Sequence, residues 1–192
     1  GRGTRLGRPH PKPLTPMRDG RTIHRHQLEH LAAVLPDAQI YVVVGFKLEM
    51  ILEAHPEQVF VYNEAYDETN TSKSLLRALR ATNDGGVLWM NGDVVFERAV
   101  LRRALPLITD GQSFVAVNTS SVGEEEVKYT LDPQNWVAQL SKTVRDGLGE
   151  AVGLNYVAAA DKAALMARLD EVADQDYFER GIELAVEKDG LR

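Results

Sequence analysis

Three short apolar runs alternate with helical patterns in the first half of the chain, and this alternation restricts the fold more than any other feature. Residues 39–46, 59–62 and 86–91 are rich in β-branched and aliphatic side chains, which is typical of strands buried on both faces. The segments around them predict helices at residues 21–35, 47–55, 72–82 and 98–108. This order predicts a parallel sheet with helices on both faces.

The pattern changes in the second half of the chain. Residues 114–118, 127–131, 136–140 and 151–157 are predicted strands, and residues 183–192 have the composition of a helix end. An α/β half therefore continues into a mixed, partly antiparallel half. Since there is no internal repeat or linker, we interpret residues 1–192 as a single domain.

Composition excludes several classes of function. The net charge of −6 argues against nonspecific nucleic-acid binding, which favours a basic face. No apolar run is long enough to cross a membrane, and without cysteine there is no disulfide and no thiolate nucleophile. Residues 2–25 are locally basic, which suits a small polyanion. We expect a soluble, cytoplasmic domain that binds small molecules, with no nucleic-acid partner.

The first residues of the chain carry the groups needed to hold a triphosphate. Gly1 and Gly3 let the backbone approach an anion, and Thr4 and Arg5 add hydrogen-bond donors beside them. Lys12 follows between two prolines, on a stiffened segment that can direct its ammonium group at the same anion. The alternative is a basic, glycine-rich terminus without fixed structure.

Two other phosphate-binding motifs do not fit. A Walker loop needs Gly-Lys followed by Ser or Thr, and the chain has no such triplet. Gly1, Gly3 and Gly7 approach a dinucleotide fingerprint, but that motif opens directly into a helix. Here three prolines follow within a few residues, at positions 9, 11 and 13, and they prevent such a helix.

A second candidate site is Asn91-Gly92-Asp93, at the end of the predicted strand 86–91. Ligands of open parallel sheets bind beyond the carboxyl ends of the strands, so a functional carboxylate is expected there. One carboxylate together with phosphate oxygens is an ordinary way to hold Mg²⁺. The alternative is that Asp93 caps the following helix near Glu97, or closes a turn with Gly92.

These segments resemble the motifs of nucleotidyltransferases, which join an NTP to a phosphorylated acceptor and carry a GxGTRL loop followed by PKP. The run from Tyr62-Asn63 through Asn70 to Ser74-Leu75 resembles the YN…N…SL segment of bacterial phosphocholine and related phospho-alcohol cytidylyltransferases. The resemblance covers nearly the whole chain. It implies a Rossmann-like GT-A-type α/β fold, a three-layer α/β/α arrangement with a mixed central sheet.

The resemblance also implies a mechanism and a nucleotide site. The enzyme would be Mg²⁺-dependent and would use an NTP, with CTP expected, and a small phosphorylated acceptor such as phosphocholine. Gly1, Gly3, Thr4 and Arg5 would hold the nucleotide phosphates, and Lys12 would lie against the α-phosphate. Asp93 would hold the metal, and the family's second metal aspartate would lie beyond residue 192. Arg5, Lys12 and Asp93 are the expected catalytic residues.

By the same resemblance Asn70 and Ser74 would approach the base or ribose, whereas helix capping alone explains Thr71 and Ser72. Lys128, Lys142 and Glu150 belong to the part of the chain that resembles the acceptor-binding half of the family, although lysines on exposed strands are usually only solvated. A separate group, consisting of His24, His26 and His30, has a spacing that suits a metal, but a solvated helix face is expected instead.

Three questions are left open by the sequence. In the related enzymes the glycine loop leaves a central strand, so we expect the domain to be incomplete at both ends and a further strand to lie between strands 39–46 and 86–91. A sugar-1-phosphate or molybdopterin-type nucleotidyltransferase is one alternative function. A nucleotide-binding regulatory domain without turnover is another.

Overall fold

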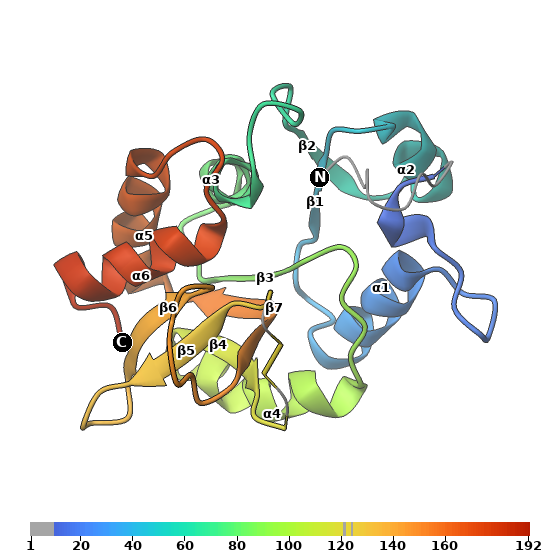
Figure 1. The fold of residues 1–192 in the computed structure, drawn as a ribbon. Helices are drawn as coiled ribbons and strands as arrows, with labels where there is room; N and C mark the ends of the chain where they lie inside the picture. The colour runs from blue at the N-terminus through green and yellow to red at the C-terminus, as the bar shows by residue number, and fades with distance from the viewer. Residues whose placement is uncertain (1–9, 121, 124) are drawn as a thin grey trace.

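The computed structural model describes residues 10–120, 122–123 and 125–192, which form a mixed α/β fold (Figure 1). The first half contains a short 3-10 helix and the elements that alternate as predicted, namely η2 (Lys12–Leu14), α1 (Ile23–Val34), β1 (Tyr41–Val44), α2 (Leu48–Ala54), β2 (Val59–Tyr62), α3 (Thr71–Ala81), β3 (Val87–Met90) and α4 (Arg98–Thr109). The second half contains β4 (Phe114–Asn118), β5 (Lys128–Leu131), β6 (Val137–Ser141), β7 (Glu150–Val157), α5 (Ala159–Glu171) and α6 (Phe178–Asp189).

β7 organises the larger sheet. The strand pairs antiparallel with β3, β4 and β5, and β6 extends the sheet by pairing with β5. A bulge interrupts the pairing with β4, near Gly153, whose φ of +72° is strained for any residue with a side chain. The predicted change from an alternating to an antiparallel half is therefore confirmed.

β1 and β2 form a separate two-stranded parallel sheet, in which Val44 is the register partner of Tyr62. Among the described residues β3 pairs with the antiparallel β7 and not with β1, so the prediction that 39–46, 59–62 and 86–91 share one parallel sheet depends on the expected strand between β1 and β3. Burial on both faces is wrong for β2: Val59 and Tyr62 are 41% and 50% exposed. Each of these strands has a described partner along one edge only, which leaves it less covered than a central strand. A further strand between β1 and β3 stays a prediction.

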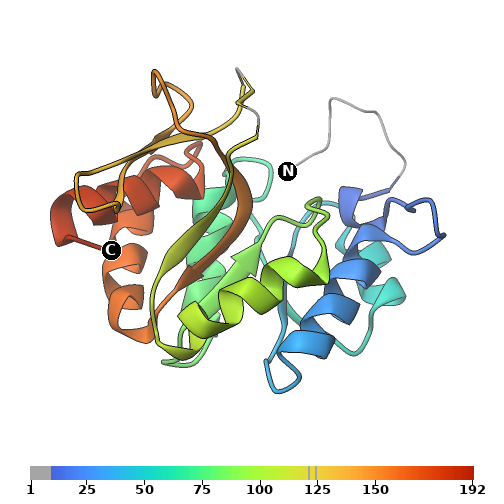
Figure 2. The same ribbon diagram turned by 90° about the horizontal axis from the view of Figure 1, so that it is seen from below.

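Helices cover both faces of the larger sheet. Neighbouring residues of a strand point to opposite faces, and a side chain on each face contacts a helix. Tyr156 of β7 points toward α4, where its hydroxyl donates to the carbonyl of Ile108 at 3.4 Å. Trp89 of β3 points the other way, and its ring meets Phe178 of α6 edge-on at 5.8 Å between centroids. Figure 2 shows α4 on the opposite side of the sheet from α5 and α6. The three-layer arrangement follows from these contacts.

The main core lies between the sheet and the helices α3, α5 and α6. Leu165 and Leu169 of α5 are fully buried, and they pack with Leu79 of α3 and Ile182 of α6. The sequence analysis did not predict α5, and it predicted only the last turns of α6. These two helices supply one whole face of the fold, which is why the second half of the chain is not simply a sheet.

Within the described part of the chain, no helix combines the length and the apolar character needed to cross a membrane.

Candidate active site

The turn Asn91-Gly92-Asp93 leaves the carboxyl end of β3, as predicted. The backbone N–H of Asn91 donates to the carbonyl of Gly153 at 2.9 Å, so the turn is fixed to the bulged strand β7. Helix α4 begins at Arg98, and its N-cap residue Glu97 makes no side-chain cap. The carboxylate of Asp93 instead pairs with an amine from the N-terminal part of the chain.

That amine is Lys12, on the short helix η2. Its Nζ donates to Oδ2 of Asp93 at 2.7 Å, and the two side chains are 47% and 40% exposed. Beside this ion pair, Pro13 packs directly on Gly92: a Cβ added to Gly92 would lie 2.8 Å from Cγ of the proline. The fold therefore brings the Pro-Lys-Pro segment and the Asn-Gly-Asp turn together into one site, which we call the Lys12–Asp93 site.

The rest of the predicted phosphate loop lies outside the described residues. Gly1, Gly3, Thr4 and Arg5 all belong to residues 1–9, so their roles stay predictions.

Asn70 and Ser74, the predicted base or ribose contacts, bond to the protein at the start of α3. Asn70 is the N-cap: its Oδ1 accepts from the N–H of Thr71 at 2.8 Å, and its Nδ2 donates to the carbonyl of Gln175 at 3.2 Å. The hydroxyl of Ser74 accepts from Nδ2 of Asn63 at 3.0 Å, and Asn63 is 1% exposed. Both residues thus form hydrogen bonds within the protein, and their contact with a nucleotide stays a prediction.

Two neighbours of Asn70 tie α3 to α6. The hydroxyl of Ser72 donates to the carbonyl of Asp176 at 2.7 Å, and the hydroxyl of Thr71 accepts from the N–H of Phe178 at 3.1 Å. The polar run at the start of α3 therefore holds two helix starts rather than capping one, which explains why it has more polar side chains than a single cap needs.

The predicted acceptor residues come together through strand pairing. Lys128 is the register partner of Glu150, and Nζ of Lys128 donates to the carbonyl of Lys142 at 3.1 Å. Glu150 accepts from the N–H of Gly123 at 3.0 Å, and Nζ of Lys142 lies 4.9 Å from the ring centre of Tyr177. Because β7 runs antiparallel to β3, its first residue lies beyond the carboxyl end of β3. Lys128, Lys142 and Glu150 thus lie at the same end of the strands as Asp93.

Glu179 is a titratable residue beside Lys142 that the sequence analysis missed. It is 9% exposed, and its Oε2 is buried without a hydrogen-bond partner among the described residues. Burial raises the pKa of Glu179 to about 7, although the nearby ammonium of Lys142 works in the opposite direction. A glutamate in the first turn of an amphipathic helix gives no sequence signal that distinguishes it from a solvated residue.

The histidines of α1 lie on its buried face, so the expectation of a solvated face is wrong. His24 and His30 are 7% and 8% exposed, and His24 packs edge-on against the ring of His55 at 4.6 Å. Burial lowers the pKa of His24 to about 4, with a further contribution from His55. Among the described residues, no three histidine, cysteine, aspartate or glutamate side chains form a group able to hold a metal ion.

The oxygen donors at the end of β3 suit one kind of metal site. Asp93 supplies a carboxylate there, and the amide of Asn91 is two residues away. Mg²⁺ usually keeps several waters and is held by one or two carboxylates together with substrate phosphates, rather than by a cage of protein ligands. A single exposed carboxylate beside a lysine fits that mode of binding.

Comparison with known proteins identifies the family. The model of the MobA-like NTP transferase domain matches residues 1–175, so the chain belongs to that family. Among curated proteins, CMP-5'-(3-aminopropyl)phosphonate synthase of Streptomyces rubellomurinus is 41% identical over 112 residues, which are 54% of this chain. The bifunctional protein GlmU of Koribacter versatilis is 30% identical over 95 residues, which are 49% of this chain. The matched segments span 17% and 20% of those two proteins.

Solved structures show the same fold at low identity. The inositol-1-phosphate CTP transferase of T. maritima has a TM-score of 0.76 and 15% identity, covering 97% of this chain and 76% of that protein. The CTP:phosphocholine cytidylyltransferase of Streptococcus pneumoniae has a TM-score of 0.72 and 16% identity, covering 98% and 82%. The expected GT-A-type nucleotidyltransferase fold is therefore confirmed.

Proposed function

We propose that this domain is a cytidylyltransferase, which transfers CMP from CTP to a small acceptor carrying a phosphate or phosphonate group and releases pyrophosphate. The observation that carries the proposal is the 2.7 Å contact between Lys12 and Asp93 beyond the carboxyl end of β3. A phosphate group bound beside this contact would have a cation and a carboxylate within reach. The choice of cytidine is supported by the names of a 41% identical relative and of two structural neighbours.

In the proposed reaction an oxygen of the acceptor attacks the α-phosphorus of CTP. A new bond forms between that oxygen and phosphorus, the bond from the α-phosphorus to the bridging oxygen breaks, and pyrophosphate leaves with that oxygen. Such chemistry depends mainly on positioning and on neutralising charge. Lys12 would stabilise the negative charge that grows on the α-phosphate, and Arg5 would hold the β- and γ-phosphates.

Magnesium completes the proposed site. A Mg²⁺ ion held by Asp93 would supply positive charge to the phosphate oxygens of both reactants. When the ion and the nucleotide are bound, Asp93 and Lys12 would no longer pair with each other. The carboxylate would face the metal, and the ammonium would face phosphate.

The acceptor would bind along the start of β7. Lys128 and Lys142 bring two positive charges to this region, where Glu150 also lies. An ammonium group can meet a phosphate or a phosphonate equally well, since both present charged oxygens. We therefore include both acceptor classes in the proposal.

The experiment is a grid of pyrophosphate-release assays on the full-length protein. CTP, UTP, GTP and dTTP are each combined with phosphocholine, inositol 1-phosphate, 3-aminopropylphosphonate and glucose 1-phosphate, with and without Mg²⁺. Turnover limited to CTP with one of the first three acceptors is expected. Nucleotide binding without turnover in any combination would contradict the proposal and indicate a regulatory domain.

A sugar-nucleotide-forming enzyme is the second candidate function. It is favoured by two structural neighbours, which are named as a nucleoside-diphosphate-sugar pyrophosphorylase and a UDP-glucose pyrophosphorylase. Turnover of UTP, GTP or dTTP with glucose 1-phosphate in the same grid would support this candidate instead.

A further inference from the structure

Gln27 of α1 binds the turn that carries Asp93. It is 4% exposed, and its Nε2 donates to the carbonyl of Asn91 at 3.0 Å and to that of Val94 at 2.7 Å. These two carbonyls flank Gly92 and Asp93. An amide group has two N–H donors, and both are used here, so one buried side chain closes the turn on both sides.

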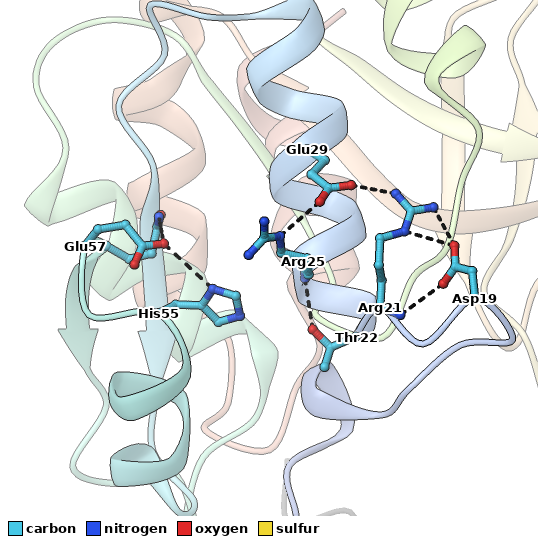
Figure 3. Close-up of polar contacts among 8 residues, drawn as sticks. Asp19, Arg21, Thr22, Arg25, Glu29, His55 and Glu57 are labelled. Carbon is cyan, nitrogen blue, oxygen red and sulfur yellow. Dashed lines mark hydrogen bonds and ion pairs between the residues drawn. The ribbon is translucent and has the colours of Figure 1, made fainter.

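The same helix also fixes the segment that carries Lys12. The first residue of α1, Ile23, donates its N–H to the carbonyl of Thr15 at 3.1 Å, just after η2 ends. On the outer side of the helix, Arg21 and Arg25 both bond to Glu29, and Arg21 also bonds to Asp19, as Figure 3 shows. Helix α1 therefore bonds to both halves of the Lys12–Asp93 site, through Ile23 and through Gln27.

The ion pair itself is poorly suited to hold these segments in place. Lys12 and Asp93 are both substantially exposed, and exposed ion pairs stabilise little. In the proposed reaction this contact is also replaced by contacts with metal and phosphate. The buried bonds of Gln27 are strengthened by the low local dielectric, and they do not depend on what Asp93 binds.

We propose that Gln27 is a positioning residue, which sets the place of Asp93 relative to Lys12 through the carbonyls of Asn91 and Val94. The proposal rests on the proposed function where it concerns catalysis. The structural part of the proposal, that Gln27 fixes the turn, is independent of the proposed function. Gln27 is buried and both of its amide N–H groups bond to the turn, so its effect on the reaction would pass through the turn.

The test compares two substitutions in the full-length protein. Gln27→Met keeps the length of the side chain but has no donor. Gln27→Lys keeps donors that can reach two carbonyls, and the chain already uses a buried lysine in this way: Lys162 is 7% exposed and donates to the carbonyls of Thr82 and Asn83. If Gln27→Met does not fold, Gln27→Asn takes its place, because its amide is one methylene too short to reach both carbonyls.

Three quantities are measured well below the unfolding temperature: kcat, the Mg²⁺ concentration for half-maximal turnover, and amide hydrogen exchange of residues 91–96. Gln27→Met should lower kcat by about tenfold to a hundredfold, the scale expected for a misplaced catalytic group. It should also raise the Mg²⁺ requirement severalfold and speed exchange in the turn, and Gln27→Lys should largely restore all three.

Wild-type kcat and Mg²⁺ requirement in Gln27→Met would overturn the positioning role, even if that variant melts at a lower temperature. Unchanged exchange of residues 91–96 would overturn the structural part as well. If the wild-type protein transfers no nucleotide while exchange in the turn still depends on Gln27, the proposed function fails and the fixing of the turn stands.

Discussion

Pro13 fills the space in front of Gly92, and its Cγ lies 2.8 Å from the place that a Cβ on Gly92 would take. This contact joins the proline-rich segment directly to the turn at the end of β3. The backbone of Gly92 does not adopt a positive φ, so its conformation does not require glycine. Glycine is needed at position 92 because a side chain there would collide with Pro13.

Gly92→Ala is therefore expected to lower turnover at least tenfold. A proline ring cannot turn aside, so either η2 or the turn must move, and even a displacement of about 1 Å can cost two orders of magnitude in rate. Gly85→Ala is the matched control, because the nearest atom to its new Cβ is a flexible side-chain oxygen of Asn83 at 3.1 Å. Equal turnover in the two variants, measured by pyrophosphate release, would show that the contact is unimportant.

Lys12→Ala should reduce kcat by about a hundredfold while changing nucleotide affinity much less. Its charge matters most as negative charge develops on the α-phosphate, and losing one such donor typically costs two to three orders of magnitude. Lys188→Ala provides a close control: Lys188 is 44% exposed and paired with Glu171, much as Lys12 is 47% exposed and paired with Asp93. Steady-state kinetics and nucleotide titration separate the two effects, and a Lys12→Ala enzyme with full kcat contradicts the role.

Asp93→Asn should abolish Mg²⁺-dependent turnover and leave the melting temperature within a few degrees of wild type. The substitution keeps the size of the side chain and removes its charge, and the exposed pair with Lys12 contributes about 1 kcal/mol at most. Asp170→Asn, which removes the charge from an exposed pair with Arg80, is the control. An active Asp93→Asn enzyme would exclude Asp93 as the metal ligand.

His24 should make the fold less stable in mild acid. Its pKa is about 4 in the folded protein and 6.5 when unperturbed, so between these values the unfolded chain binds a proton that the folded chain excludes. Its stabilising effect is complete above pH 6.5 and is lost as pH falls toward 4. His24→Phe removes this titration, so its melting temperature should fall less between pH 7 and pH 5 than that of the wild type. Parallel melting curves for the two proteins would contradict the assignment.

The order of elements up to β7 was predictable because apolar runs and helical spacing are local signals. The signal for α5 was local as well: Leu165 and Leu169 lie four residues apart, on one face of a helix, and both are fully buried. Helix α5 could therefore have been predicted from the sequence. The motifs also singled out Lys12 and Asp93, because each carries a recognisable local pattern; the structure brings the two side chains into contact, and their roles stay predictions.

The support around the site could not be predicted in the same way. Gln27 bonds to carbonyls 64 and 67 residues away, and a glutamine on a helix gives no sign of such partners. The buried face of α1 carries His24, Gln27 and His30, so a search for an apolar stripe selects the wrong side. The antiparallel pairing of β3 with β7 depends on long-range contacts, which local patterns do not encode.

The shared hydrogen bonds of Thr71 and Ser72 make the starts of α3 and α6 one cooperative unit. Loosening the loop at Asp176 removes a partner from the first turn of α3, and loosening α3 removes the bond that holds the first N–H of α6. These two ends should therefore lose amide protection together and at the same rate, although they are about a hundred residues apart along the chain. Local unfolding at the start of either helix should therefore expose the backbone amides at the start of the other.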